Sequence, residues 1–152
     1  MAHPISTTYL DVQTARASAA LAAAGAFDTS PKEMYCPGFD FVTLYVTYTR
    51  GGAAGAVKLR IDESPDSSGT VWAPRGAYGP ATVAAGSDAS SLEQRETLTY
   101  TATGASAEVF TVGPLALNGA VERLRVAAAE SGNAGAPGTV AIQARFSCYD
   151  SD

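Results

Sequence analysis

Residues that could carry out catalysis are few in this sequence. The one histidine, His3, lies in a polar N-terminal stretch, and a nucleophilic triad or a Cys–His pair would have to use it. A chain terminus does not hold the preorganised geometry that such a site needs. The glycine-rich run 51–55 lacks the lysine and the following helix of a phosphate-binding loop. We therefore expect the protein not to be an enzyme and assign no catalytic residue.

Three carboxylates gather in the run 62–66, which reads Asp-Glu-Ser-Pro-Asp. Oxygen ligands of this kind bind calcium, but the run lacks the alternating acid-x-acid ladder of a loop-type site and Pro65 stiffens its middle. A solvated turn is the favoured interpretation. A pair among Asp62, Glu63 and Glu96 could hydrolyse a glycosidic bond, but nothing in the sequence sets the separation that this reaction requires. We expect no metal and no cofactor.

Two cysteines, Cys36 and Cys148, are present. They are too few for a disulfide framework, and with a single histidine they do not make a zinc site. The favoured interpretation is two reduced thiols in the core of a cytoplasmic product. A disulfide bridge that ties the two ends of the chain together remains open.

The charge of the chain limits its partners. Of 152 residues 16% are charged, the net charge is −5 and the isoelectric point is near 4.7. The basic residues are scattered, which argues against a nucleic-acid partner. No apolar run reaches membrane-spanning length and no signal peptide is recognisable, so we expect neither a membrane partner nor secretion. A surface with so few charges is typical of a protein buried in a larger assembly.

The elements that must hold any site are predicted to be β-strands. In residues 41–49 apolar and Thr residues alternate with period two, and residues 57–61 alternate in the same way. Residues 51–55 are predicted to form a hairpin loop between these two strands. Residues 57–73 resemble a second hairpin, with its turn at 64–69.

Further strands are predicted later in the chain, at residues 96–101, 107–112, 121–128 and 139–149, with loops at 74–93 and 131–138. Short strands separated by turns predict an all-β fold, an antiparallel, jelly-roll-like β-sandwich. We expect a flexible N-terminal arm over residues 1–14 and a single sandwich domain over 15–152. Within that domain, residues 15–27 could be an Ala-rich helix or a strand.

Two aromatic residues near the predicted 57–73 hairpin could bind a ligand. Trp72 and Tyr78 flank a short loop segment, and aromatic rings on a sandwich loop can stack on a sugar. The competing interpretation is that both rings pack against the core, as large aromatic residues usually do.

One family resemblance rests on the runs 41–51, 57–66 and 69–72. A strand pair followed by a Ser-x-Asp turn and a Trp resembles small structural proteins of tailed phages. The resemblance implies a virion protein on the capsid surface, assembled in the host cytoplasm: a decoration (cement) protein that binds the major capsid protein as a homotrimer and stabilises the head shell. The same hairpin is similar to parts of carbohydrate-binding sandwiches, which implies as alternative a sugar-binding module on a tail or surface structure. The turn is longer than the usual Asp-Gly form, so no ligand residues carry over.

Overall fold

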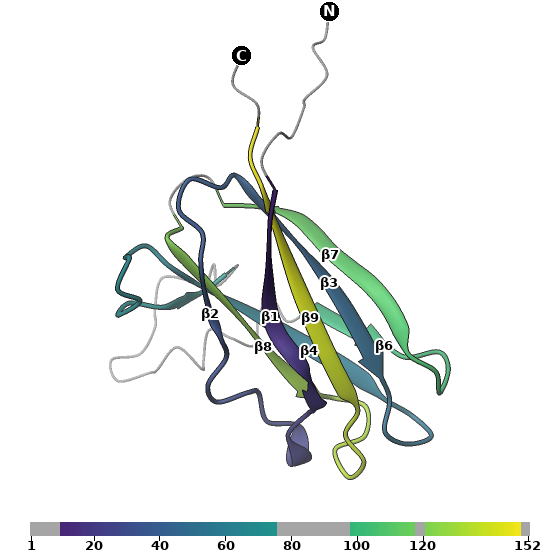
Figure 1. Ribbon diagram of the computed structural model, residues 1–152. Helices are drawn as coiled ribbons and strands as arrows, with labels where there is room; N and C mark the ends of the chain where they lie inside the picture. The colour runs from purple at the N-terminus through teal and green to yellow at the C-terminus, as the bar shows by residue number, and fades with distance from the viewer. Residues whose placement is uncertain (1–9, 76–97, 118–120, 150–152) are drawn as a thin grey trace, which may run out of the picture.

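The computed structural model describes residues 10–75, 98–117 and 121–149, and their regular structure is almost entirely β-strand (Figure 1). The strands are β1 (Leu10–Ala20), β2 (Glu33–Tyr35), β3 (Phe41–Thr49), β4 (Ala56–Ser64), β5 (Ala73–Pro74), β6 (Leu98–Thr101), β7 (Glu108–Ala116), β8 (Arg123–Glu130) and β9 (Thr139–Ser147). A single 3-10 turn, η1 (Ala23–Gly25), follows β1. No helix in the described ranges is long and apolar enough to cross a membrane.

The strands form two antiparallel sheets that pack face to face. Sheet A has the order β1-β9-β3-β7, and sheet B has the order β2-β8-β4, with β5 and β6 sharing the remaining edge of β4. Apart from the β4–β5–β6 succession, consecutive strands alternate between the sheets. This strand order is that of a jelly roll. The predicted antiparallel sandwich is therefore confirmed.

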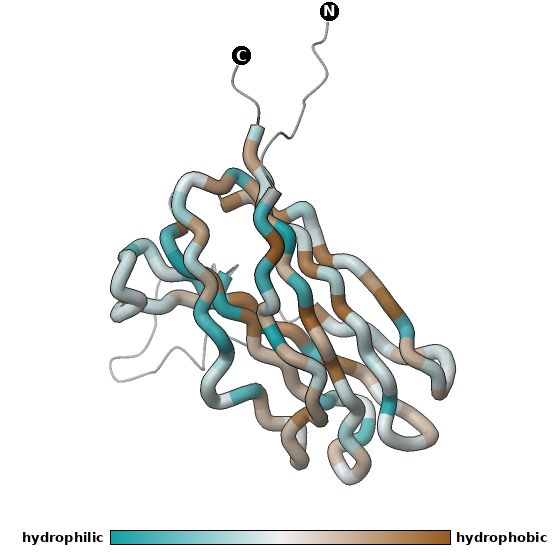
Figure 2. Tube along the Cα trace, viewed as in Figure 1, coloured by the Kyte–Doolittle hydropathy of each residue, from teal (hydrophilic) through white to brown (hydrophobic). Residues whose placement is uncertain are grey.

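Alternating side chains explain why the sheets pack together. In β3 the residues Val42, Leu44, Val46 and Tyr48 are buried, and the residues between them point outward. Figure 2 shows the same alternation of hydrophobic and hydrophilic residues along the strands. Fully burying an aliphatic or aromatic side chain contributes roughly 1.5–3 kcal/mol, so one apolar face per strand suffices to hold two sheets together.

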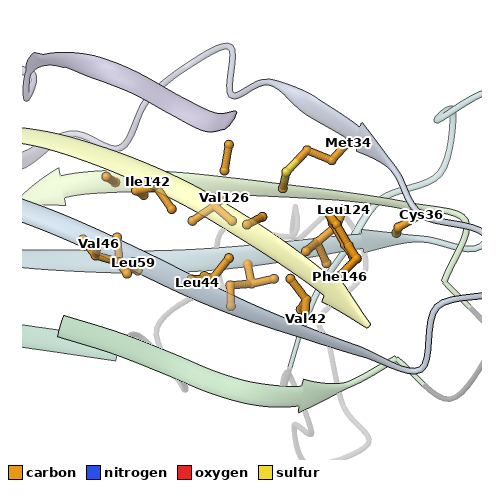
Figure 3. Close-up of a cluster of buried hydrophobic side chains, with 14 of the residues drawn as sticks. Met34, Cys36, Val42, Leu44, Val46, Leu59, Leu124, Val126, Ile142 and Phe146 are labelled. Atoms are coloured by element: carbon orange, nitrogen blue, oxygen red, sulfur yellow. The ribbon is translucent and has the colours of Figure 1, made fainter. Parts of the chain in front are cut away.

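The core lies between the sheets. Side chains from β3 and β9 point toward those from β4 and β8, with Met34 of β2 at the edge (Figure 3). The largest fully buried hydrophobic side chains are Tyr48, Phe146, Met34, Leu44, Leu59, Leu117, Leu124 and Ile142.

Two predicted hairpins are corrected by this topology. Residues 51–55 do not close a hairpin, because β3 lies in sheet A and β4 in sheet B. The predicted hairpin 57–73 is reduced to two residue pairs between β4 and β5, and Val71 and Trp72 lie outside any strand. The physical reason is that the apolar face of a strand must be buried against a second sheet. When the chain crosses from one sheet to the facing sheet, the next strand buries that apolar face.

The N-terminal boundary is also corrected. The arm was expected to extend to residue 14, but β1 begins at Leu10 and pairs with β9 along its length. Among residues 11–20 of β1 only Ala15 is buried, and the apolar Val12 is 60% exposed. The backbone ladder with β9 holds this strand. The open choice for residues 15–27 resolves into the end of β1 followed by η1. Residues 1–9 of the arm, most of the 74–93 loop and residues 96–97 lie outside the described ranges.

Candidate functional site

Trp72 is engaged with neighbours in sheet B. The Arg125 guanidinium lies 4.2 Å from the centroid of its ring, and the indole N–H donates to the carbonyl of Gly69 at 2.8 Å. One face of the ring is thus covered by a cation. Tyr78 lies outside the described residues, so the Trp72–Tyr78 pair stays a prediction.

Asp62 is the centre of a cation network on the outside of sheet B. The carboxylate is only 3% exposed and accepts hydrogen bonds from Arg60 at 3.1 Å and from Arg125 at 2.9 Å. Arg60 also lies over the ring of Phe27, 5.2 Å from its centroid. Two guanidinium groups compensate the desolvation of this carboxylate, which leaves it no free oxygen for substrate or metal chemistry.

The other carboxylates of the 62–66 run have separate partners. Glu63 pairs with Arg75. Asp66 accepts hydrogen bonds from Ser68 and from the backbone of Thr70 and Val71, and these bonds hold the pKa of its carboxyl well below the ordinary range. In the described ranges no three His, Cys, Asp or Glu side chains gather as a metal site. Glu96 and His3 lie outside the described residues.

Glu130 at the end of β8 is a buried acid that the sequence analysis missed. Its side chain points into the sandwich, where the carboxylate accepts hydrogen bonds from the Tyr48 hydroxyl at 2.8 Å and from the backbone N–H groups of Ala56 at 3.0 Å and Gly138 at 2.9 Å. Gly132 and Asn133 donate as well. The sequence does contain a signal for Glu130: it continues the series of inward-facing residues of β8, Leu124, Val126 and Ala128, which are otherwise apolar.

The electrostatics of Glu130 follow from these contacts. Burial acts to raise the pKa of its carboxyl, but the hydrogen bonds together outweigh burial, and the pKa lies below its ordinary value. The same contact and burial raise the pKa of Tyr48 above its ordinary range. The carboxylate therefore serves as an acceptor that joins the end of β3 and the start of β4 to the 131–138 loop, which is a structural role.

Both cysteines are free thiols. Cys36 is fully buried, and burial, with help from Glu122 and Glu63, raises its pKa to about 12. A thiol with that pKa is not nucleophilic at neutral pH. The two thiols are not bridged in the structure, and Cys36 lies in the core as expected, whereas Cys148 is only half-buried.

Sheet A ends in two edge strands, β1 and β7. No strand pairs with the outer side of β7 in the described part of the chain. Its single charged residue, Glu108, bends back to accept hydrogen bonds from Tyr100, Thr103 and Gly104, which lower the pKa of its carboxyl to about 2. Beyond Glu108 the strand is uncharged, and Val109 is 67% exposed.

A shallow hollow of about 430 Å³ lies on the outer face of sheet A. Its walls come from Phe41 and Tyr45 of β3, Arg145 of β9, Pro114 of β7 and Tyr149 after the end of β9. A second hollow, beside the irregular part of β1, is crossed by Arg16, which pairs with Asp28 and donates to the carbonyls of Ala19 and Val140. The guanidinium group of the second hollow is therefore already engaged within the protein.

Comparison with known proteins finds no relative. No protein-family model matches the sequence. No curated protein and no solved structure matches the chain either.

Proposed function

We propose that this protein is a non-enzymatic structural component of a phage particle. In this proposal it is a decoration (cement) protein that binds the major capsid protein and copies of itself, as a homotrimer on the head shell. The resemblance of residues 41–72 to small tailed-phage structural proteins suggests this role. The jelly-roll fold supports it, because capsid proteins are among those that use this architecture.

The observation that carries the proposal is the first half of the β7 edge, which precedes Pro114 and the register shift beside it. Edge strands in proteins that stay monomeric are usually blunted by charges, prolines or cover. The only charged residue of β7, Glu108, accepts hydrogen bonds from the 103–104 turn, and Val109 and Thr111 are exposed. Such an edge is a template for pairing with another chain, which is what a protein that cements a lattice requires.

The polar clusters of the described structure support a binding role over a catalytic one. Asp62, Asp66, Glu108 and Glu130 each have their acceptor positions filled by separate donors. Carboxylates whose oxygens already accept hydrogen bonds from the protein stabilise the local structure and are poorly placed to exchange protons with a substrate. Affinity would then come from the total contact area with neighbours.

The test is to block the edge with charge. We expect the purified wild-type chain to run as a trimer in light scattering and to sediment with assembled shells. In the double variant Val109→Lys and Thr111→Lys, repulsion between added charges at the edge should reduce both self-association and shell binding by roughly tenfold or more.

The matched control is Thr139→Lys, which adds a charge to exposed Thr139 of β9, a strand paired on both edges. It should leave both measurements unchanged. A wild-type chain that is strictly monomeric and does not bind shells would rule out the proposal. A dimer would remove the trimeric arrangement but keep the β7 edge as the contact.

A further inference from the structure

The hollow on the outer face of sheet A is built by two neighbouring central strands. Phe41, Thr43 and Tyr45 alternate with the buried residues of β3, as Arg145 and Ser147 do in β9. The register places Thr43 opposite Arg145 and Phe41 opposite Ser147, and opposite residues hold their Cβ atoms about 4.5–5.5 Å apart. Aromatic rings, hydroxyls and a guanidinium therefore meet on one patch of the sheet.

Tyr149 forms a fixed wall of this hollow. Its backbone N–H donates to the Asp40 carboxylate at 2.8 Å, and its ring meets that of Phe41 edge to face, with centroids 4.7 Å apart at 86°. The side chain nevertheless remains 50% exposed. The Tyr149 ring is already fixed by Phe41 and has one side open, so little side-chain entropy would be lost when a ligand binds to it.

Two arginines of the described structure, Arg50 and Arg145, make no ion pair; the Nε atom of Arg50 is buried without a hydrogen-bond partner, whereas Arg145 is exposed. In the described ranges Arg145 makes no hydrogen bond or ion pair, and its side chain is exposed beside the hollow. Five others are each paired with a carboxylate: Arg16, Arg60, Arg75, Arg123 and Arg125. A planar guanidinium with all its donors available suits a carboxylate ligand, which it can hold through two parallel hydrogen bonds.

We propose that this hollow binds an acidic saccharide, with a sugar ring packed on Tyr149 and Tyr45 and its carboxylate on Arg145. The apolar C–H face of a sugar packs on an aromatic ring, and sugar hydroxyls match the hydroxyls of Thr43 and Ser147. A volume of about 430 Å³ is in the ordinary range for small-ligand sites. The site is distinct from Trp72, whose ring face is covered by Arg125.

Two other ligand classes fit the hollow less well. A peptide docking on a sheet gains affinity from backbone hydrogen bonds at an edge, but β3 and β9 lie inside the sheet, paired on both sides, and Pro114 on β7 has no N–H to donate. A nucleic acid needs several cations, whereas this hollow offers one and the chain carries a net charge of −5.

The experiment is a titration of the full chain with trigalacturonic acid, compared with the neutral galactotriose, followed by calorimetry and by ligand-observed NMR. We expect the acidic trisaccharide to bind at least tenfold more tightly than the neutral one. Arg145→Gln should abolish that preference and Arg145→Lys should retain part of it, because a lysine keeps the charge but not the two parallel hydrogen bonds. Tyr149→Ala should weaken binding of both trisaccharides.

Gln143→Ala is the matched control, because Gln143 is exposed on β9 two positions from Arg145 and does not line the hollow. This variant should bind like the wild type, and thermal midpoints of all variants should agree within a few degrees. No binding of either trisaccharide at millimolar concentration would overturn the proposal, as would binding that Arg145→Gln and Tyr149→Ala leave unchanged. The hollow reaches from Phe41, opposite Ala116, to Tyr45, opposite Thr111 of the β7 edge. The Arg145 and Tyr149 variants leave β7 itself unchanged, so their effect on trisaccharide binding is separate from the test of the β7 edge.

Discussion

Glu130 is a buried acid that links several segments of the fold through hydrogen bonds. The residue is 2% exposed, and its carboxylate accepts hydrogen bonds from the Tyr48 hydroxyl and from the backbone N–H groups of Ala56 in β4 and Gly138 in the 131–138 loop. A buried carboxylate is costly unless its oxygens are paired, and here donors from β3, β4 and the 131–138 loop all contribute. The consequence is a rigid join at one end of the sandwich.

Replacing that acid should therefore be costly. In Glu130→Gln one carboxylate oxygen is replaced by an NH2 group, which cannot accept a hydrogen bond from the backbone N–H groups that face it. We expect the free energy of unfolding to fall by about 2–4 kcal/mol. Urea unfolding measures this as a lower midpoint at an unchanged slope. Glu108→Gln, at the exposed 103–104 turn, is the comparison and should shift the midpoint by much less. Equal shifts would contradict the linking role of Glu130.

The crossing loops are the elements that decide this architecture. The 50–55 loop carries the chain from β3 in sheet A to β4 in sheet B, and the 131–138 loop carries it from β8 in sheet B to β9 in sheet A. The two loops pack closely, because a Cβ on Gly51 would collide with the carbonyl oxygens of Ala136 and Pro137. A Cβ on Gly138 would likewise collide with the backbone of Thr49 and the ring of Tyr48 at the end of β3. Glycine is needed here for close approach of two loops.

This packing predicts a position-specific effect of alanine in one loop. Gly138→Ala forces the 131–138 loop away from the end of β3, and we expect it to cost about 2–4 kcal/mol of unfolding free energy. Gly135→Ala lies in the same loop, where the nearest atom to an added Cβ is 3.7 Å away, and it should change stability by less than about 0.5 kcal/mol. Thermal unfolding of the two variants side by side distinguishes them, and an equal loss in both would refute the close approach.

The molecule as a whole should be most stable near neutral pH. Asp66, Glu108 and Glu130 have folded pKa values below their ordinary values of 3.8, 4.5 and 4.5. A lowered folded pKa gives stability that is complete above the ordinary value and is lost as the pH falls through the folded one. Tyr48 and Cys36 have raised pKa values, so their contribution is complete below the ordinary values of 10.0 and 9.0 and is lost at higher pH.

We therefore expect the free energy of unfolding to be flat between about pH 5 and pH 8 and to fall on both sides of that range. Urea unfolding at a series of pH values measures this curve. In Glu130→Gln the acid limb should be shallower than in the wild type, since one of the groups that drives it is gone. A wild-type protein that is as stable at pH 3 as at pH 7 would contradict this account.

The order of residues along the chain was enough to predict the strand class and much of the strand placement. Period-two alternation in residues 41–49 places one side of β3 in the core, and the structure confirms it. The same rule located β4, β8 and β9 to within a few residues. It works because each of these strands has one face on the core and one face toward solvent.

Pairing partners, by contrast, depend on contacts between distant residues and could not be obtained from local patterns. Neighbouring strands in the sequence were expected to form hairpins, whereas β3 pairs with β7 and β9. The strand β1 was missed from Leu10 to Thr14 because its ladder with β9, and not a side-chain pattern, holds it there. The hollow around Arg145 arises in the same way, since Phe41 and Tyr149 are far apart in the chain and meet only when β9 lies beside β3. Side-chain alternation is a local property, but which strand lies beside which follows from burying every apolar face at once.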